Sequence, residues 1–175
     1  IMTAIEFITK LRDAAPVIEN LEGFMEREVA QAFIGGYNAK RKDNEFKENK
    51  TLLFELVENY QVQKIEVGIL SFLKNLRIVG DRIEFGMCGE HTIAVDGITG
   101  EIVLLEIDDY LKVNYCCARD FEHFLGVFLH YAWYNNRELA GYSFNRDGME
   151  LIVREGVELA GGKSYELFLK FIFQS

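Results

Sequence analysis

One short hairpin pattern constrains the fold of this chain more than any other feature. Two apolar runs lie on either side of the turn sequence Gly97-Ile98-Thr99-Gly100. In the register that pairs Asp96 with Glu101, apolar residues face one another along one side of the hairpin. The facing pairs are Val95 with Ile102 and Ile93 with Leu104. The segment therefore predicts two antiparallel strands, and with them an antiparallel sheet.

The strand pattern extends beyond this hairpin. Four segments are short, rich in β-branched or aromatic residues, and separated by Gly or Asp. They are residues 65–70, 82–86, 91–96 and 101–107. The run Ile102–Leu105 is apolar on both faces, so we expect this strand to be central and covered, at least in part, on both sides.

Helical patterns precede and follow the strands. The strongest begins after Asp120, where apolar residues recur at helical spacing and predict an amphipathic helix that packs on the sheet. Its stripe consists of Phe121, Phe124, Leu125, Phe128, Leu129 and Ala132. At the N-terminus, Thr3 and Glu6 have the spacing of a capping box, which is typical of a helix start.

Further helices are predicted on both sides of the sheet. After Pro16 one apolar stripe runs to Gly35-Gly36, and these glycines stop the helix. The stripe consists of Ile18, Leu21, Met25, Val29, Ala32 and Phe33. Shorter patterns cover residues 52–60 and 149–160, whereas residues 165–173 fit both a strand and a helix, of which we favour the helix.

These elements predict a single α+β domain over residues 1–175, with a twisted, mostly antiparallel sheet flanked by helices. The N-terminal helices occupy residues 3–60, the sheet residues 65–107 and the C-terminal helices residues 118–173. A hydrophobic content of 49% is sufficient to fill one core.

Acidic residues are concentrated in the predicted sheet. Between Arg82 and Lys112 there are seven of them and no Lys or Arg. They are Glu84, Glu90, Asp96, Glu101, Glu106, Asp108 and Asp109. Such a surface attracts basic partners, although like charge on a solvated face also serves solubility alone. With a net charge of −9, direct binding to nucleic acid is not expected.

Motifs for catalysis or metal binding are absent from the sequence. Gly162-Lys163-Ser164 lacks the first glycine and the preceding strand of a phosphate-binding loop, so we interpret it as the end of a helix. His91, His123 and His130 do not have the spacing of a metal site. We therefore predict a protein that is not an enzyme and that holds no metal or cofactor.

The cysteines indicate the compartment. Cys88, Cys116 and Cys117 form neither a C-x-x-C motif nor an even-numbered disulfide framework, which fits a reducing cytoplasm. The first fifteen residues lack a signal-peptide pattern, and no run of eighteen apolar residues could span a membrane. The expected location is the cytoplasm.

Half of the chain, about residues 51–135, resembles the SUKH superfamily (Smi/Knr-like proteins). The resemblance rests on fold-pattern residues. They are the strand Glu66-Val67-Gly68-Ile69-Leu70, the strand end Glu84-Phe85-Gly86, the hairpin strands Ile93-Ala94-Val95-Asp96 and Thr99-Gly100-Glu101-Ile102-Val103, and the helix start Asp120-Phe121-Glu122-His123-Phe124-Leu125. This superfamily consists mainly of bacterial immunity proteins and also includes yeast regulators of cell-wall synthesis.

The resemblance implies an α+β fold and an immunity function. An immunity protein of this kind binds and neutralises a cognate toxin, often a nuclease or a deaminase. Carboxylates of Glu90, Glu106, Asp108 and Asp109 would then pair with Lys and Arg of a basic toxin, with Tyr110 as an aromatic anchor. The alternative is a regulatory or scaffolding module, of the yeast-regulator type, that binds endogenous proteins.

Overall fold

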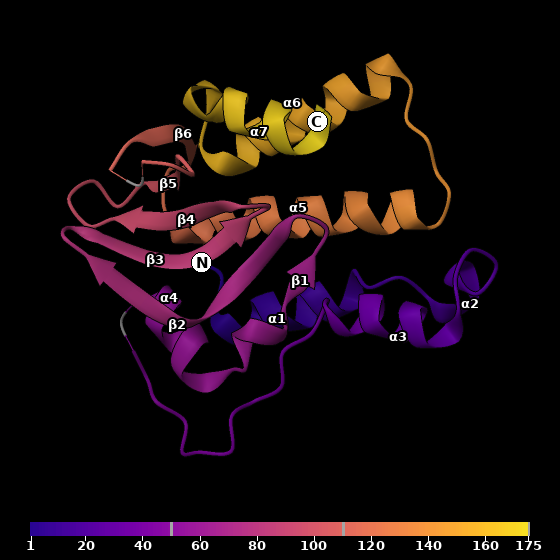
Figure 1. The fold of residues 1–175 in the computed structure, drawn as a ribbon, viewed down its shortest axis with the longest axis horizontal. Coiled ribbons are helices and arrows are strands. Elements are labelled where there is room, and N and C mark those ends of the chain that lie inside the picture. The colour runs from indigo at the N-terminus through magenta and orange to yellow at the C-terminus, as the bar shows by residue number, and fades with distance from the viewer. Residues whose placement is uncertain (50, 110, 175) are drawn as a thin grey trace.

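The computed structural model describes residues 1–49, 51–109 and 111–174, and within them six strands form one antiparallel sheet. The strands follow one another in chain order, so each pairs with the one before it (Figure 1). They are β1 Glu66–Val67, β2 Leu70–Val79, β3 Arg82–Cys88, β4 His91–Asp96, β5 Ile102–Leu105 and β6 Val113–Ala118. Helices before and after the sheet complete an α+β domain, as the sequence predicts.

The predicted hairpin register is confirmed. Val95 faces Ile102 and Ile93 faces Leu104, while the Asp96 N–H donates to the Glu101 carbonyl at 2.8 Å. All four residues of β5 are buried, and the strand lies between β4 and β6. Because β5 is covered on both faces, its continuous apolar run is accounted for.

The predicted single strand over residues 65–70 is wrong. The chain reverses at Gly68, whose φ of +55° suits glycine, and β1 pairs with β2 across this tight turn. The long strand β2 was not predicted, because it contains a large bulge: between Phe72 and Arg77 four residues lie opposite a single one, Phe85. A bulge of this kind removes the apolar/polar alternation by which a strand is recognised.

Two further differences concern the ends of the predicted elements. The last strand of the hairpin ends at Leu105, so Glu106 and Ile107 belong to a loop rather than to the predicted strand over residues 101–107. The sheet also continues through β6 to Ala118, beyond its predicted end at residue 107. The structure therefore adds a strand between the predicted sheet and the predicted C-terminal helices.

The helices are α1 Ala4–Asp13, α2 Ile18–Leu21, α3 Arg27–Gly35, α4 Leu52–Asn59, α5 Phe121–Leu139, α6 Arg146–Ala160 and α7 Glu166–Gln174, with short 3-10 turns η1 Val62–Lys64 and η2 Lys163–Tyr165. The capping box of α1 is present, with Thr3 and Glu6 each accepting from the backbone N–H of the other. The expected helix at residues 165–173 is confirmed as α7.

The predicted second N-terminal helix is interrupted. Residues 22–26 separate α2 from α3, so the expected continuous stripe is divided between two helices. Within α3 the buried side chain is that of Ala30, whereas Val29 and Phe33 of the predicted stripe are 45% and 40% exposed. An apolar stripe on a helix predicts a surface that covers it, but in α3 the described residues leave much of Val29 and Phe33 uncovered.

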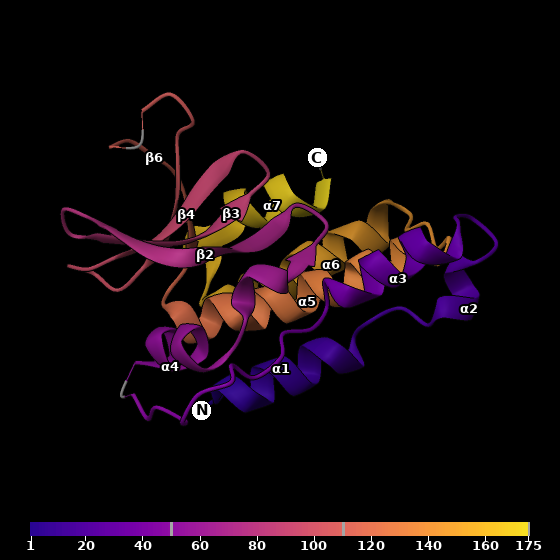
Figure 2. The ribbon, with the colours of Figure 1, turned by 60° about the horizontal axis from the view of Figure 1, so that its bottom comes forward.

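Phenylalanine rings join the N-terminal helices, the sheet and the C-terminal helices. Phe128 of α5 lies 5.7 Å from Phe7 of α1 and 5.5 Å from Phe72 of β2, measured between ring centroids. On the next strand Phe85 meets Phe121 and Phe124 of α5 at 5.1 and 5.4 Å. Helix α5 therefore covers the inner face of the sheet, as its stripe predicts (Figure 2).

Asp120 caps this central helix and provides a test of the fold. Its carboxylate accepts from the backbone N–H of His123 at 2.9 Å and from His123 Nδ1 at 2.7 Å. Burial raises the pKa of Asp120, but these hydrogen bonds, with the charges of His123 and Arg119, outweigh it, so the net pKa is lowered. A lowered folded-state pKa means that the ionised cap stabilises the fold above the unfolded pKa of about 3.9, and that this contribution is lost as the pH falls through the folded value.

We therefore expect Asp120→Ala to lower the free energy of unfolding by about 1 kcal/mol at neutral pH, as for other N-cap losses. Urea denaturation of both proteins measures the difference, which should shrink in acid as the wild-type carboxylate becomes protonated. Glu45→Ala, in the exposed loop before α4, is the control and should unfold like the wild type. A loss at Asp120 that is the same at neutral and acid pH would contradict the capping role.

Candidate protein-binding site

The loop between β5 and β6, residues 106–112, carries four of the five predicted site residues, of which three are described, and backbone hydrogen bonds close it. The Glu106 N–H donates to the Lys112 carbonyl at 3.0 Å, and the Lys112 N–H donates to the Asp109 carbonyl at 2.9 Å. The Asp109 carboxylate also accepts from the Leu111 N–H at 3.1 Å. The side chains of Asp108 and Asp109 are exposed. These bonds hold the β5–β6 loop as a compact turn that presents acids to solvent.

Glu90 lies at the end of the sheet where β4 begins and β5 ends, next to the start of this loop. It occupies the tight turn between β3 and β4, in which Cys88 pairs with His91. His91 Nδ1 lies 2.9 Å from the Leu105 carbonyl and donates to it, so the residues next to Glu90 and Glu106 are in direct contact. The structure thus brings Glu90 and Glu106 to one end of the sheet, and Asp108 and Asp109 follow on the same loop. The predicted anchor Tyr110 lies outside the described residues.

The other acids of the span are engaged within the fold. Glu84 is buried, and its Oε1 lies 3.0 Å from Nε of Arg77 on β2. Asp96 accepts from the Ile98 N–H at 2.9 Å and so holds the β4–β5 turn. Glu101 accepts from the Tyr165 hydroxyl at 3.2 Å. Asp109 holds its own turn in the same way as Asp96, but its side chain is exposed whereas that of Asp96 is half-buried. We therefore take Glu90, Glu106, Asp108 and Asp109 as the acids available to a partner.

Apolar side chains are exposed beside these acids. Leu111 and Ile107 of the β5–β6 loop are 76% and 48% exposed. The Leu111 carbonyl accepts from Arg82 Nη2 at 3.0 Å, which holds the loop over the outer face of the sheet. A shallow hollow of about 260 Å³ lies at this point, with Leu111, Val79 and Ile98 on its walls. Exposed aliphatic groups bordered by charge are typical of the centre and rim of a protein interface.

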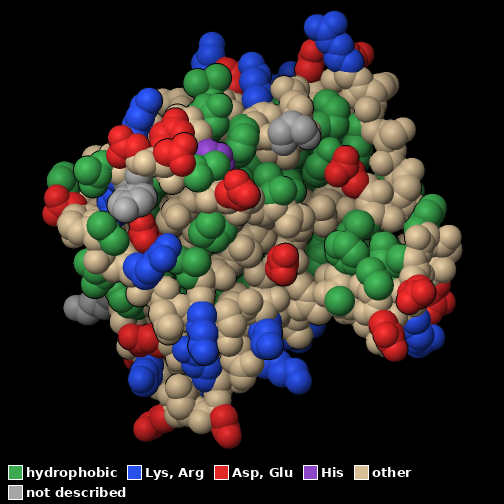
Figure 3. All heavy atoms as spheres, viewed as in Figure 1, with side chains coloured by type: hydrophobic (Ala, Val, Ile, Leu, Met, Phe, Trp, Pro, Cys, Tyr) green, Lys and Arg blue, Asp and Glu red, His purple; other side chains and the backbone are tan. Residues whose placement is uncertain are grey.

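Figure 3 shows this arrangement on the surface. On the part of the molecule formed by β4, β5 and β6, acidic side chains gather with hydrophobic ones between them. Ile107 and Leu111 were not predicted as site residues. The signal that could have identified them is their position among, or shortly after, closely spaced acids. Both lie past the residues that pair in the hairpin register, so no strand pairing places them on the inner face.

The thiols do not have the properties of a reactive site. Burial raises the pKa of Cys88 to about 12 and raises that of Cys117 still more clearly above its ordinary value. Cys116 is exposed, yet burial of its sulfur, together with the nearby Glu101 and Asp96, also raises its pKa. At neutral pH all three are therefore thiols rather than the nucleophilic thiolates.

The remaining sequence candidates have structural partners. His130 Nε2 lies 2.8 Å from the Ile152 carbonyl, and His123 belongs to the cap of α5. Gly161, with φ of +112°, ends α6, which confirms that the Gly162-Lys163-Ser164 sequence follows a helix end. Within residues 1–49, 51–109 and 111–174, no three His, Cys, Asp or Glu side chains are grouped closely enough to hold a metal ion.

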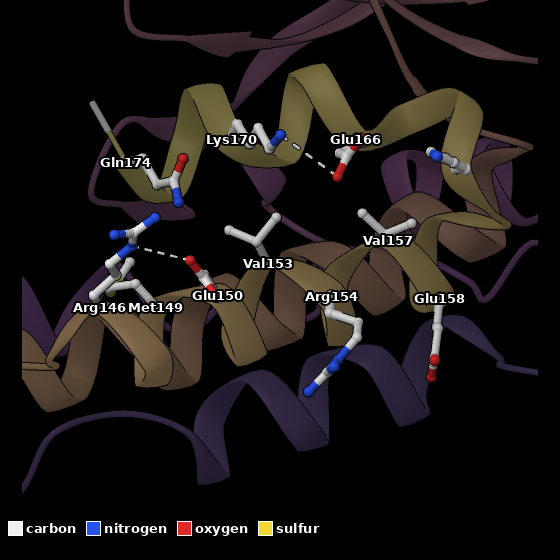
Figure 4. Close-up of a pocket in the computed structure, with 11 residues that line it drawn as sticks. Arg146, Met149, Glu150, Val153, Arg154, Val157, Glu158, Glu166, Lys170 and Gln174 are labelled. Atoms are coloured by element: carbon white, nitrogen blue, oxygen red, sulfur yellow. Dashed lines mark hydrogen bonds and ion pairs between the residues drawn. The ribbon is translucent and has the colours of Figure 1, made fainter.

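A larger hollow lies elsewhere, between α6 and α7, with a volume of about 730 Å³ (Figure 4). Its floor is apolar and is formed by Met149, Val153 and Val157. Charged side chains line its walls as ion pairs one helical turn apart: Arg146 with Glu150 at 3.2 Å, and Lys170 with Glu166 at 3.5 Å. Arg154, Glu158 and Lys163 line it as well, so the hollow is a groove with an apolar floor and charges of both signs along its walls.

None of the described helices is both long and apolar enough to cross a membrane. The resemblance to the SUKH superfamily stays a prediction from the sequence. Comparisons with protein-family models, with curated proteins and with solved structures found no match to this chain.

Proposed function

We propose that this chain is a binding protein that neutralises a basic protein toxin, in the manner of a bacterial immunity protein. The observation that carries the proposal is the β5–β6 loop, which exposes Asp108 and Asp109 next to the apolar side chains of Ile107 and Leu111. The acids supply attraction to a basic surface, and the aliphatic groups supply area to bury once contact is made. The family resemblance of the sequence supports the same function.

The mechanism we propose is occlusion. A toxin that acts on nucleic acid carries clustered Lys and Arg at its substrate-binding surface. The carboxylates of Glu90, Glu106, Asp108 and Asp109 would pair with these cations and block access of the nucleic acid. Because Glu90, Asp108 and Asp109 are exposed, Glu106 is half-buried, and all belong to a chain of net charge −9, long-range attraction would also accelerate encounter.

The experiment is a charge reversal with a matched control. The protein to be tested is the product of the gene beside that for this chain, which we expect to contain a basic toxin domain, and binding is measured by calorimetry at low and at physiological salt. We expect Asp108→Lys with Asp109→Lys to weaken binding by about 10- to 1,000-fold, because two attractive contacts become repulsive. Glu45→Lys with Glu48→Lys changes the net charge equally at an exposed loop remote from that end of the sheet and should bind like the wild type.

The outcomes separate the proposal from its alternative. Equal binding by both double variants would remove the acidic loop from the mechanism. If the toxin does not bind, and several housekeeping proteins of the native host bind instead, a regulatory or scaffolding role is supported. The groove between α6 and α7 favours this second candidate, since a scaffold needs a further surface besides the acidic loop.

A further inference from the structure

Helix α3 carries a second surface, at the opposite end of the molecule from the β5–β6 loop (Figures 1 and 2). Val29 and Phe33, one helical turn apart, are exposed on it, and Phe24 in the preceding turn is 70% exposed. Arg27 lies on the other side of the helix and pairs with Glu22 at 3.1 Å, whereas Glu28 lies one turn before Ala32, beside the stripe. The apolar stripe is thus continuous and separate from the proposed toxin-binding site.

A hollow of about 420 Å³ lies beside the stripe, between α3 and the β1–β2 turn. Small residues line it: Ala32, Gly35 and Gly36 from the helix, and Gly68 from the turn. At Gly35 no atom lies within 4 Å of the place where a Cβ would stand, which leaves room for an aromatic ring, whereas at Gly36 and Gly68 that space is filled by the Glu66 carbonyl and the Tyr131 hydroxyl. The ring of Phe33 stands at the wall of the same hollow. The same patch therefore contains an exposed aromatic ring, that of Phe33, and a hollow that could accept such a ring.

We infer that this patch joins two copies of the chain in a two-fold symmetric dimer. A two-fold axis that places Phe33 of one copy in the hollow of the second also places the second Phe33 in the hollow of the first. A patch with its own ring and its own hollow satisfies this condition with one kind of surface.

The charges at the hollow fit the same arrangement. Its charged lining residues are Lys64 and Glu66, one of each sign, and neither side chain forms an ion pair with another described residue. Across a two-fold axis, Lys64 of each copy can meet Glu66 of the other. This local neutrality matters because two chains of net charge −9 repel each other at most other orientations. The dimer also leaves both β5–β6 loops uncovered.

The test is the mass in solution, measured by sedimentation velocity over a range of micromolar concentrations. The wild type should approach twice the 20.2 kDa of one chain as concentration rises. Phe33→Glu should weaken dimerisation by about 30-fold or more, as the loss of an interface hot spot does. Leu167→Glu places the same charge at a leucine of α7 that is 66% exposed and should dimerise like the wild type.

A charge swap tests the two-fold pairing without altering the apolar stripe. Lys64→Glu alone sets like charges against each other and should weaken dimerisation, and adding Glu66→Lys should restore it. A wild type that stays at the mass of one chain at every concentration overturns the inference. So does a Phe33→Glu protein that dimerises normally, or a double swap that fails to recover.

Discussion

Phe128→Ala is expected to lower the free energy of unfolding by about 3–5 kcal/mol, the usual cost of removing a buried aromatic side chain. The ring of Phe128 is buried and joins three parts of the fold, through contacts with Phe7 of α1, Phe72 of β2 and Phe124 of α5. No neighbouring element can move inward to fill the space without breaking its contacts with the other two. Chemical denaturation followed by circular dichroism measures the loss.

The matched control for this change is Leu167→Ala. It also removes a large apolar side chain from a helix, but one that is 66% exposed, so its effect should stay within about 0.5 kcal/mol. If Phe128→Ala unfolded with a loss as small as the control, the cluster of rings would not be the centre of the core.

Two adjacent glycines of the α3 end should respond in opposite ways to the same substitution. A Cβ at Gly36 would collide with the backbone carbonyl of Glu66, while the Gly36 carbonyl accepts from the Glu66 N–H at 2.9 Å. Gly36→Ala must therefore separate α3 from β1, with an expected cost of about 1–3 kcal/mol or more. At Gly35 no atom lies within 4 Å of the added Cβ.

Gly35→Ala is accordingly expected to stabilise the chain by about 0.4–1 kcal/mol, because alanine restricts the unfolded state and favours the helix. Thermal or urea unfolding at low protein concentration compares the two variants. Similar effects at both positions would mean that the close approach of α3 to β1 is not a fixed feature of the fold.

The elements that could be predicted from the sequence are those whose pattern is local. The pairing of Val95 with Ile102 follows from a short turn and the two-residue period of strands, and α5 follows from its stripe of rings. For α7 both periods fitted, and burial of Phe168, Leu169, Ile172 and Phe173 shows that the helical one holds.

The elements that could not be predicted depend on distant partners. The bulge opposite Phe85 removes the alternation of β2, in a strand whose Phe72 packs on Phe7 of the distant helix α1. The stripe of α3 was recognised, but a stripe does not reveal whether the chain itself covers it. At the candidate site the acids could be found by charge alone, whereas the exposure of Leu111 depends on how the loop folds over the sheet.

The order of strands in the sheet has a consequence for synthesis on the ribosome. Because each strand pairs with its predecessor in sequence, hairpins can close one after another as the chain emerges. The helix that covers Phe85, however, is made only after β6 is complete. When residues up to Ala118 have left the ribosome, the strands can pair, but α5 does not yet cover the apolar face of the sheet. We therefore expect the nascent chain to be most prone to aggregation in the interval before α5 emerges.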